Sequence, residues 1–174
     1  MICFQASFII LSELSTFTKT IELQTLMIFK TVVDLTTLNK WGLNTLASHL
    51  GIEFVEAGED FLTARMPVDD RTRQPFGILH GGASAALAES VGSVAATLCL
   101  DLSQYSVVGL EINANHLKPV KDGYVYGTAR PVHVGHRTHV WEIRITDEAQ
   151  KLVCISRLTL MIVNKNVPDE TKIR

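Results

Sequence analysis

The sequence is poor in cysteine, with three residues in 174, at Cys3, Cys99 and Cys154. Their odd number, their wide spacing and the lack of a C-x-x-C pair argue against a disulfide framework and against a thiolate zinc site. Free cysteine usually behaves as a small buried apolar residue, so we interpret all three as reduced. Because reduced thiols are typical of a reducing compartment, we expect a cytoplasmic protein.

The sequence also lacks an excess of basic charge. Its 16 Lys and Arg residues stand against 18 Asp and Glu, which leaves a formal net charge of −2. Nucleic-acid-binding surfaces draw much of their affinity from a basic excess. We therefore expect no nucleic-acid partner, although a local basic patch for a small phosphorylated ligand is compatible with this balance.

Long apolar runs are missing as well. The run Phe8 to Leu11 is far shorter than the roughly 20 apolar residues of a membrane span, and no Lys or Arg precedes Lys19, as a secretory signal would require. We expect no membrane association. The regular pattern begins at Met27, so we interpret residues 1–26 as a non-core extension, 27–165 as one domain and 166–174 as a frayed polar tail.

The order of the expected elements is typical of an α+β domain with one central helix. Asp34 is the expected N-cap of a short helix over 35–49, which ends at Gly51. The one long helix is expected over 80–100, where twelve of 21 residues are Ala, Gly or Ser. Small side chains would let a curved sheet pack closely around this helix. Strands are expected over 52–57, 61–68, 106–117, 124–134, 138–146 and 152–163.

The start of the long helix offers a site for an oxyanion. The first N–H groups of a helix have no partners within it and lie at the positive end of its dipole. His80, Gly81 and Gly82 open this helix, and glycine there lets a ligand carbonyl approach the backbone.

Glu89 lies nine residues further on, beside small residues. A carboxylate on an inward face is costly unless it has partners or a task. Ser93 follows at i+4, on the same side of the helix. The alternative is a solvent-facing or ion-paired Glu89. The His-Gly-Gly helix start and the upstream Gln74 favour the catalytic interpretation.

From Met27 to Val163 the sequence resembles the hot-dog acyl-CoA thioesterases of the 4-hydroxybenzoyl-CoA thioesterase type, with a glutamate on the central helix. Within them it resembles the branch that contains 1,4-dihydroxy-2-naphthoyl-CoA hydrolase and the proofreading thioesterase of enterobactin synthesis. The resemblance implies an antiparallel sheet wrapped around the long helix, and an acyl-CoA substrate. The motifs that carry it are Met66–Asp69, Gln74–Gly77, Leu79–Gly82, Leu87–Ser93 and Val108–His116.

The resemblance also implies roles for these residues. Glu89 is the nucleophile or the general base towards the thioester carbonyl, and the sequence leaves both roles open. The Gly81 N–H and the Gln74 amide hold the carbonyl oxygen, His80 assists at the thiolate leaving group, and Ser93 orients water or an intermediate. The family builds each site across a homodimer interface, with Glu89 from one subunit and Gln74 and His80 from the other, and two dimers usually form a tetramer. No cofactor is implied.

Further segments match those that contact CoA in this family. Lys118 and Arg137 could neutralise its phosphates, the alternative being ordinary solvated cations. The matching residues are Gly109, His116, Leu117, Lys118, Pro119, His133, Val134, Gly135, His136, Arg137 and Thr138.

The spacing of His133, His136 and His139 invites a metal-site interpretation. On a continuous strand His133 and His139 would share a face, while His136 would point to the other. A compact three-histidine site is therefore not expected, and we predict no metal.

Two rival functions are an acyl-ACP dehydratase or enoyl-CoA hydratase of the same fold and a non-catalytic acyl-CoA sensor. The dehydratases and hydratases use local motifs other than His-Gly-Gly. Known sensors of this kind carry a DNA-binding domain, for which residues 1–26 are too short. For the substrate, Val94 after Ser93 favours 1,4-dihydroxy-2-naphthoyl-CoA and hence quinone biosynthesis. A broad aryl- or acyl-CoA thioesterase is the alternative, because a few methylenes are enough to change such a specificity.

Overall fold

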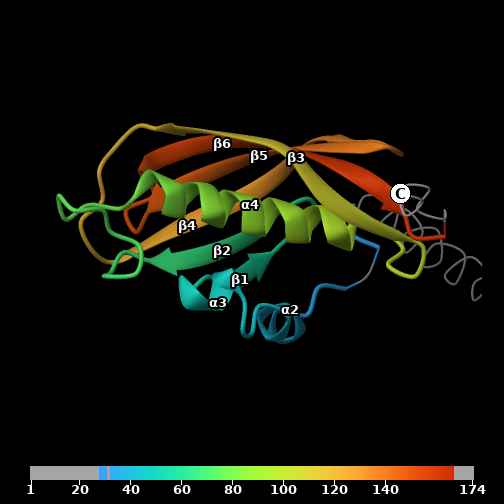
Figure 1. The fold of residues 1–174 in the computed structure, drawn as a ribbon, viewed down its shortest axis with the longest axis horizontal. Helices are drawn as coiled ribbons and strands as arrows, with labels where there is room; N and C mark the ends of the chain where they lie inside the picture. The colour runs from blue at the N-terminus through green and yellow to red at the C-terminus, as the bar shows by residue number, and fades with distance from the viewer. Residues whose placement is uncertain (1–27, 31, 167–174) are drawn as a thin grey trace, which may run out of the picture.

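The computed structural model describes residues 28–30 and 32–166 (Figure 1). The expected extension, residues 1–26, lies outside these ranges, as does the expected tail apart from its first residue, so both assignments stay predictions. A single six-stranded antiparallel sheet, in the order β1-β2-β4-β5-β6-β3, forms the body of the molecule. Its strands are β1 Glu53–Ala57, β2 Leu62–Pro67, β3 Tyr105–His116, β4 Tyr124–Val134, β5 Thr138–Asp147 and β6 Leu152–Asn164.

The long helix α4, Gly81–Leu98, lies across one face of the curved sheet (Figure 1). Its small residues allow the close packing that the sequence predicts. A Cβ added to Gly92 would lie 2.7 Å from Leu158 Cδ2 of β6, so no larger residue fits at this crossing without a shift. The α+β class and the arrangement of the sheet around a central helix are confirmed.

The expected single helix over 35–49 is wrong, because the structure divides it into α2, Leu35–Trp41, and α3, Leu46–His49. Between them Asn44 takes a positive φ of 60°, a conformation that a helix interior does not allow. Thr45 then begins α3 with a capping box. The expected N-cap is confirmed, since the Asp34 carboxylate accepts a hydrogen bond from the Thr36 N–H at 3.0 Å.

Alternation along β5 determines which residues enter the core. Trp141, Ile143 and Ile145 are fully buried. Glu142 and Arg144 lie on the other face and form an ion pair at 3.4 Å. The burial of Trp141, Ile143 and Ile145 thus follows the period of two in the sequence.

Among the described residues, β3 lies at the edge of the sheet and pairs with β6 alone. Its register against β6 shifts between Gly109 and Glu111, so Leu110 is an extra residue in a β-bulge. The bulge turns both Gly109 and His116 towards α4: Gly109 lies against Glu89, and His116 lies against Gly81. Without the bulge, Gly109 and His116 would face opposite sides of the sheet, because one position number is odd and the other even.

Within residues 28–30 and 32–166, no helix has the length and apolarity needed to cross a bilayer.

Candidate active site

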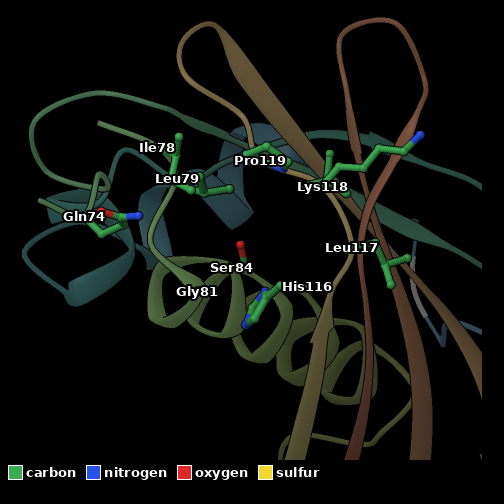
Figure 2. A pocket seen from close by; sticks show the side chains of 10 residues that line it. Gln74, Ile78, Leu79, Gly81, Ser84, His116, Leu117, Lys118 and Pro119 are labelled. Carbon is green, nitrogen blue, oxygen red and sulfur yellow. The ribbon is translucent and has the colours of Figure 1, made fainter. Parts of the chain in front are cut away.

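A pocket of about 460 Å³ opens beside the first turn of α4 (Figure 2). It is formed by the loop before the helix, by the helix start and by the segment that follows β3. Six of its residues are ones that the sequence predicts for the site. The lining residues are Gln74, Ile78, Leu79, Gly81, Ser84, His116, Leu117, Lys118, Pro119 and Val153.

His80 is the N-cap of α4. Its Nδ1 accepts a hydrogen bond from the Gly82 N–H at 2.8 Å, and its backbone carbonyl accepts from Ala83 and Ser84. The Gly81 N–H, by contrast, donates to no atom of the described residues, and Gly81 lines the pocket. One N–H at the positive end of the helix is thus available to a ligand oxygen. With Nδ1 engaged as an acceptor, the neutral His80 ring carries its proton on Nε2.

Gln74 reaches the pocket from the loop that precedes α4. Its side-chain oxygen accepts a hydrogen bond from the Phe76 N–H, which leaves the amide nitrogen directed towards the cavity (Figure 2). A tight turn holds this arrangement: the Gly77 N–H donates to the Gln74 carbonyl at 2.9 Å, and the Gln74 N–H donates to Ile78 at 2.8 Å. Gly77 has a φ of 78°, which favours glycine at this position.

The start of the same loop is also well held. The Thr72 hydroxyl is buried, donates to the Pro67 carbonyl at 2.7 Å and accepts from the Asp69 N–H at 3.0 Å. A hydrogen bond from the Arg71 side chain lowers the pKa of Asp69, so this carboxylate is ionised at neutral pH. These contacts fix the backbone that carries Gln74.

His116 lies directly over the helix start. A Cβ added to Gly81 would lie 2.7 Å from the His116 Nε2, so the imidazole rests against the Gly81 backbone (Figure 2). The His116 ring occupies the space that a side chain at position 81 would need, which explains why the first helical residue is a glycine.

Glu89 and Ser93 form a second group, two turns further along α4. The Ser93 hydroxyl donates to Glu89 Oε1 at 3.0 Å, and both residues are partly buried. A Cβ added to Gly109 of β3 would lie 2.8 Å from the same oxygen. Gly109, which the resemblance assigns to CoA contact, thus lies against the carboxylate.

The two groups lie apart within one chain. Glu89 follows Gly81 by eight residues, which corresponds to about 12 Å along the helix axis. A glutamate side chain does not reach a carbonyl held at the Gly81 N–H over that distance. Neither Glu89 nor Ser93 lines the pocket that contains Gln74 and Gly81.

The remaining predicted CoA contacts, residues 133–138, lie at the β4–β5 hairpin. The expectation that His133 and His139 share a face of one strand is wrong, because His133 lies in β4 and His139 in β5, and the register of β4 shifts between Pro131 and His133. His133 is exposed, whereas His139 is buried with 1% of its surface accessible. Within the described part of the chain, no group of three or more His, Cys, Asp or Glu residues has metal-binding geometry.

Four residues of the pocket were missed by the sequence reasoning: Ile78, Leu79, Ser84 and Val153. The Ser84 hydroxyl points into the cavity (Figure 2). Its position three residues after Gly81, on the same side of the helix, was a usable signal. Val153 has no such signal, since only the pairing of β6 with β3 brings it here.

Comparison with known proteins assigns the chain to a family. Residues 76–154 match the thioesterase superfamily. The chain is 52% identical over 137 residues to the 1,4-dihydroxy-2-naphthoyl-CoA hydrolase of Escherichia coli, which covers 79% of this chain and 100% of that protein. It is 49% identical to the proofreading thioesterase EntH of Cronobacter turicensis, over 79% of this chain and 99% of that protein.

A solved structure of a thioesterase from Haemophilus influenzae superposes with a TM-score of 0.80 and 50% identity, covering 82% of this chain and 99% of that chain. The protein belongs to the thioesterase superfamily and has its hot-dog fold. It is a thioester hydrolase.

Proposed function

We propose that the protein hydrolyses an aryl-CoA thioester to the free acid and CoA, with Glu89 as its catalytic carboxylate. The observation that carries the proposal is the pair of groups on α4: an unengaged N–H at Gly81 and a carboxylate held by Ser93. Hydrolase and thioesterase are the activities in the names of the relatives. These names favour hydrolysis over the dehydratase and sensor alternatives.

The Gly81 N–H and the Gln74 amide nitrogen polarise the thioester carbonyl. Gly81 lines the pocket as the first residue of α4, and the Gln74 amide nitrogen is directed into it (Figure 2), so both donors are held in place before substrate arrives. As a nucleophile adds to the carbonyl carbon, negative charge develops on the oxygen, where fixed donors stabilise it. When the C–S bond breaks, the leaving thiolate takes a proton, and the donor that we assign to this step is His80 Nε2, the ring nitrogen that the Gly82 N–H leaves free.

Glu89 supplies the attack, either through its own oxygen or by removing a proton from water. Direct attack gives a mixed anhydride that water then hydrolyses. In the general-base route, water adds to the thioester carbonyl as Glu89 takes its proton, and elimination of the CoA thiolate then gives the acid. In both routes the Ser93 hydroxyl orients the carboxylate through Oε1.

Each complete site takes Glu89 from one subunit and Gln74 and His80 from its partner. The 12-residue β3 offers the surface for this assembly, because it is an edge strand with one neighbour in the part of the chain that the structure describes. Antiparallel pairing of two copies of β3 places the Gly109 end of one strand beside the His116 end of the other. Glu89 lies at the first end and Gly81 at the second, so pairing brings together groups that one chain keeps about 12 Å apart. Two such dimers form the tetramer that we predict.

The same pairing provides a path for CoA. Thr138 pairs with Met161, and Met161 with Val108, so the β4–β5 hairpin lies towards the Tyr105 end of β3. Residues 133–138 of one subunit then approach residues 116–119 of the other. Lys118 and Arg137 are exposed and suited to bind phosphate oxygens there.

We propose 1,4-dihydroxy-2-naphthoyl-CoA as the substrate, in menaquinone or phylloquinone biosynthesis, supported by the name of the Escherichia coli relative. A broad or proofreading acyl and aryl thioesterase is the second candidate, supported by the EntH relative. Measured kcat/KM values over aryl and aliphatic acyl-CoA thioesters separate the two. A preference of at least about 100-fold for the naphthoyl thioester supports the first. Similar values across the panel support the second.

The catalytic assignment is tested with Glu89→Gln. This amide keeps the shape of the side chain but can neither attack nor accept a proton, so most of kcat should be lost while CoA binding is retained. The measurement is thiol release from benzoyl-CoA. A variant that keeps more than about a tenth of the wild-type kcat, about 1.4 kcal/mol of barrier, removes Glu89 from this role.

A further inference from the structure

Ser84 contributes a hydroxyl group to the buried side of the pocket beside the first turn of α4. The residue exposes 2% of its surface, and its hydroxyl points into the cavity (Figure 2). Leu79 and Val153, the other buried residues of the same lining, are apolar. The inner side of the pocket therefore presents an apolar surface with one hydroxyl group on it.

The Ser84 hydroxyl forms no hydrogen bond with any residue that the structure describes, unlike other hydroxyls of α4. The Ser90 and Thr97 hydroxyls each donate to the carbonyl four residues before them, at 2.7 Å and 2.8 Å. For Ser84 that carbonyl belongs to His80, and it already accepts from the N–H groups of Ala83 and Ser84. A buried hydroxyl without a partner is costly, because it loses its hydration and gains nothing in return. The Ser84 hydroxyl is thus available to a group of the substrate.

The position of Ser84 selects which group of the substrate it can reach. Ser84 follows Gly81 by three residues, about 4.5 Å along the axis and on the same side of the helix. A thioester oxygen at the Gly81 N–H therefore lies within one turn of the Ser84 hydroxyl. In an aryl thioester, a hydroxyl ortho to the carbonyl lies about 2.7 Å from the carbonyl oxygen, at O–H···O hydrogen-bond distance. A para hydroxyl lies at the opposite end of the ring.

The other polar side chains of the lining have different positions or tasks. The Gln74 amide nitrogen is assigned to the thioester oxygen, and the His116 ring rests against the Gly81 backbone. Lys118 is exposed and belongs to the segment that we assign to CoA. Ser84 is the polar residue of the lining that lies on the buried side, where the aryl ring is enclosed.

We propose that Ser84 is a specificity-determining residue, which selects aryl-CoA thioesters with a hydroxyl group ortho to the carbonyl by a hydrogen bond to that hydroxyl. This inference rests on the proposed function and names its substrate class, the ortho-hydroxyaryl-CoA thioesters. The substrate that we propose, 1,4-dihydroxy-2-naphthoyl-CoA, belongs to this class, since its hydroxyl at carbon 1 neighbours the acyl group at carbon 2. By donating to the ring oxygen, Ser84 leaves the proton of that hydroxyl free to bond the thioester carbonyl.

Values of kcat/KM on the full-length protein test the assignment with benzoyl-CoA, 2-hydroxybenzoyl-CoA and 4-hydroxybenzoyl-CoA. Ser84→Ala should lower the ratio of 2-hydroxybenzoyl-CoA to benzoyl-CoA about 10-fold, as expected for the loss of one hydrogen bond. The ratio of 4-hydroxybenzoyl-CoA to benzoyl-CoA should not change. The thioesters differ in intrinsic reactivity, but this difference cancels when each ratio is compared between variant and wild type. Alanine suits a helix interior, so the fold should be kept.

Ser90→Ala is the matched control and should leave all ratios unchanged, because its hydroxyl is bonded within the helix. An unchanged 2-hydroxybenzoyl ratio in Ser84→Ala overturns the proposal. So does an equal loss with benzoyl-CoA, which would place Ser84 at the thioester carbonyl, or an equal loss with the 2- and 4-hydroxy compounds.

A failure of the proposed function gives a separate result. The ratios do not depend on which residue attacks the carbonyl, so an error in the Glu89 assignment would appear in Glu89→Gln and not in Ser84→Ala. If the wild type hydrolyses none of the three thioesters, the proposed function fails. The dissociation constants of the same thioesters, measured by isothermal titration calorimetry on wild type and Ser84→Ala, then decide about Ser84 by the same ratios.

Discussion

Gly109→Ala tests how closely the catalytic carboxylate is positioned. The added Cβ would lie 2.8 Å from Glu89 Oε1, whereas ordinary contact begins at 3.4 Å. The oxygen must therefore retreat by about 0.6 Å, and its 3.0 Å hydrogen bond from Ser93 is disturbed with it. A misplacement of about 1 Å can cost on the order of 100-fold in rate. We expect kcat to fall about 10-fold, which corresponds to about 1.4 kcal/mol.

The assay is thiol release from benzoyl-CoA, with kcat and KM determined separately. The backbone of Gly109 has no positive φ, so alanine fits its conformation and the melting temperature should change little. Gly42→Ala is the matched control, because its Cβ would meet only ordinary contacts, at 3.5 Å and beyond. In the Glu89→Gln background the Gly109→Ala change should cost no further activity, since the two act through one group.

Two results would refute this reasoning. If Gly109→Ala keeps more than half of the wild-type kcat, the contact with Glu89 does not position the carboxylate for the reaction. If it lowers kcat by the same factor in the presence and absence of the Glu89 carboxylate, Gly109 acts on something else, such as CoA contact.

Three further predictions follow from the site and its surroundings. Ser93→Ala should lower kcat about 10-fold, since a hydrogen bond to a charged group contributes about 1.5 kcal/mol. Ser90→Ala is the control and should leave kcat unchanged, because the Ser90 hydroxyl donates to the Ala86 carbonyl and not to Glu89. Equal kcat values for the two variants contradict this prediction. Mixing Glu89→Ala with Gln74→Ala subunits under conditions of subunit exchange should restore about a quarter of the wild-type sites. Random pairing makes about half of the dimers mixed, and each mixed dimer has one intact site of its two. Activity that stays at the level of the separate mutants, with exchange verified by mass spectrometry, speaks against the shared site. The free energy of unfolding should fall as the pH drops below about 6.5, because burial lowers the pKa of His139 in the folded state and the unfolded state then binds more protons. Urea denaturation at pH 7.5 and 5.5 should show a smaller loss of unfolding free energy for His139→Gln than for the wild type. An equal loss in the two proteins would assign the effect to other groups.

The sequence by itself determined the order of the elements, the α+β class and the chemistry gathered on the long helix. These follow from local rules. Period-two alternation identified the buried side of β5, and the small residues from His80 to Leu100 indicated a helix that a sheet packs against closely. His80, Gly81, Glu89 and Ser93 lie within about four turns of one helix, so their spacing alone placed the last two on one side.

Local rules failed where a single backbone conformation interrupts the periodicity. Asn44, with its positive φ, divides one expected helix into two. Leu110 enters β3 as a bulge and brings Gly109 and His116 to the same side of the sheet. The shift between Pro131 and His133, together with the turn that follows, separates His133 from His139. Such interruptions depend on which strand lies alongside, and this information is not contained in a single segment.

Only the tertiary structure decided how the candidate groups are distributed in space. It placed Gln74 and Gly81 in one pocket with His116, and it placed Gly109 against Glu89. The burial of His139 likewise depends on strands that pair across the sheet, not on the residues next to it in the chain. The physical reason is that a residue's identity and spacing specify its chemistry and its side of an element, whereas its neighbours come from packing between elements distant in sequence.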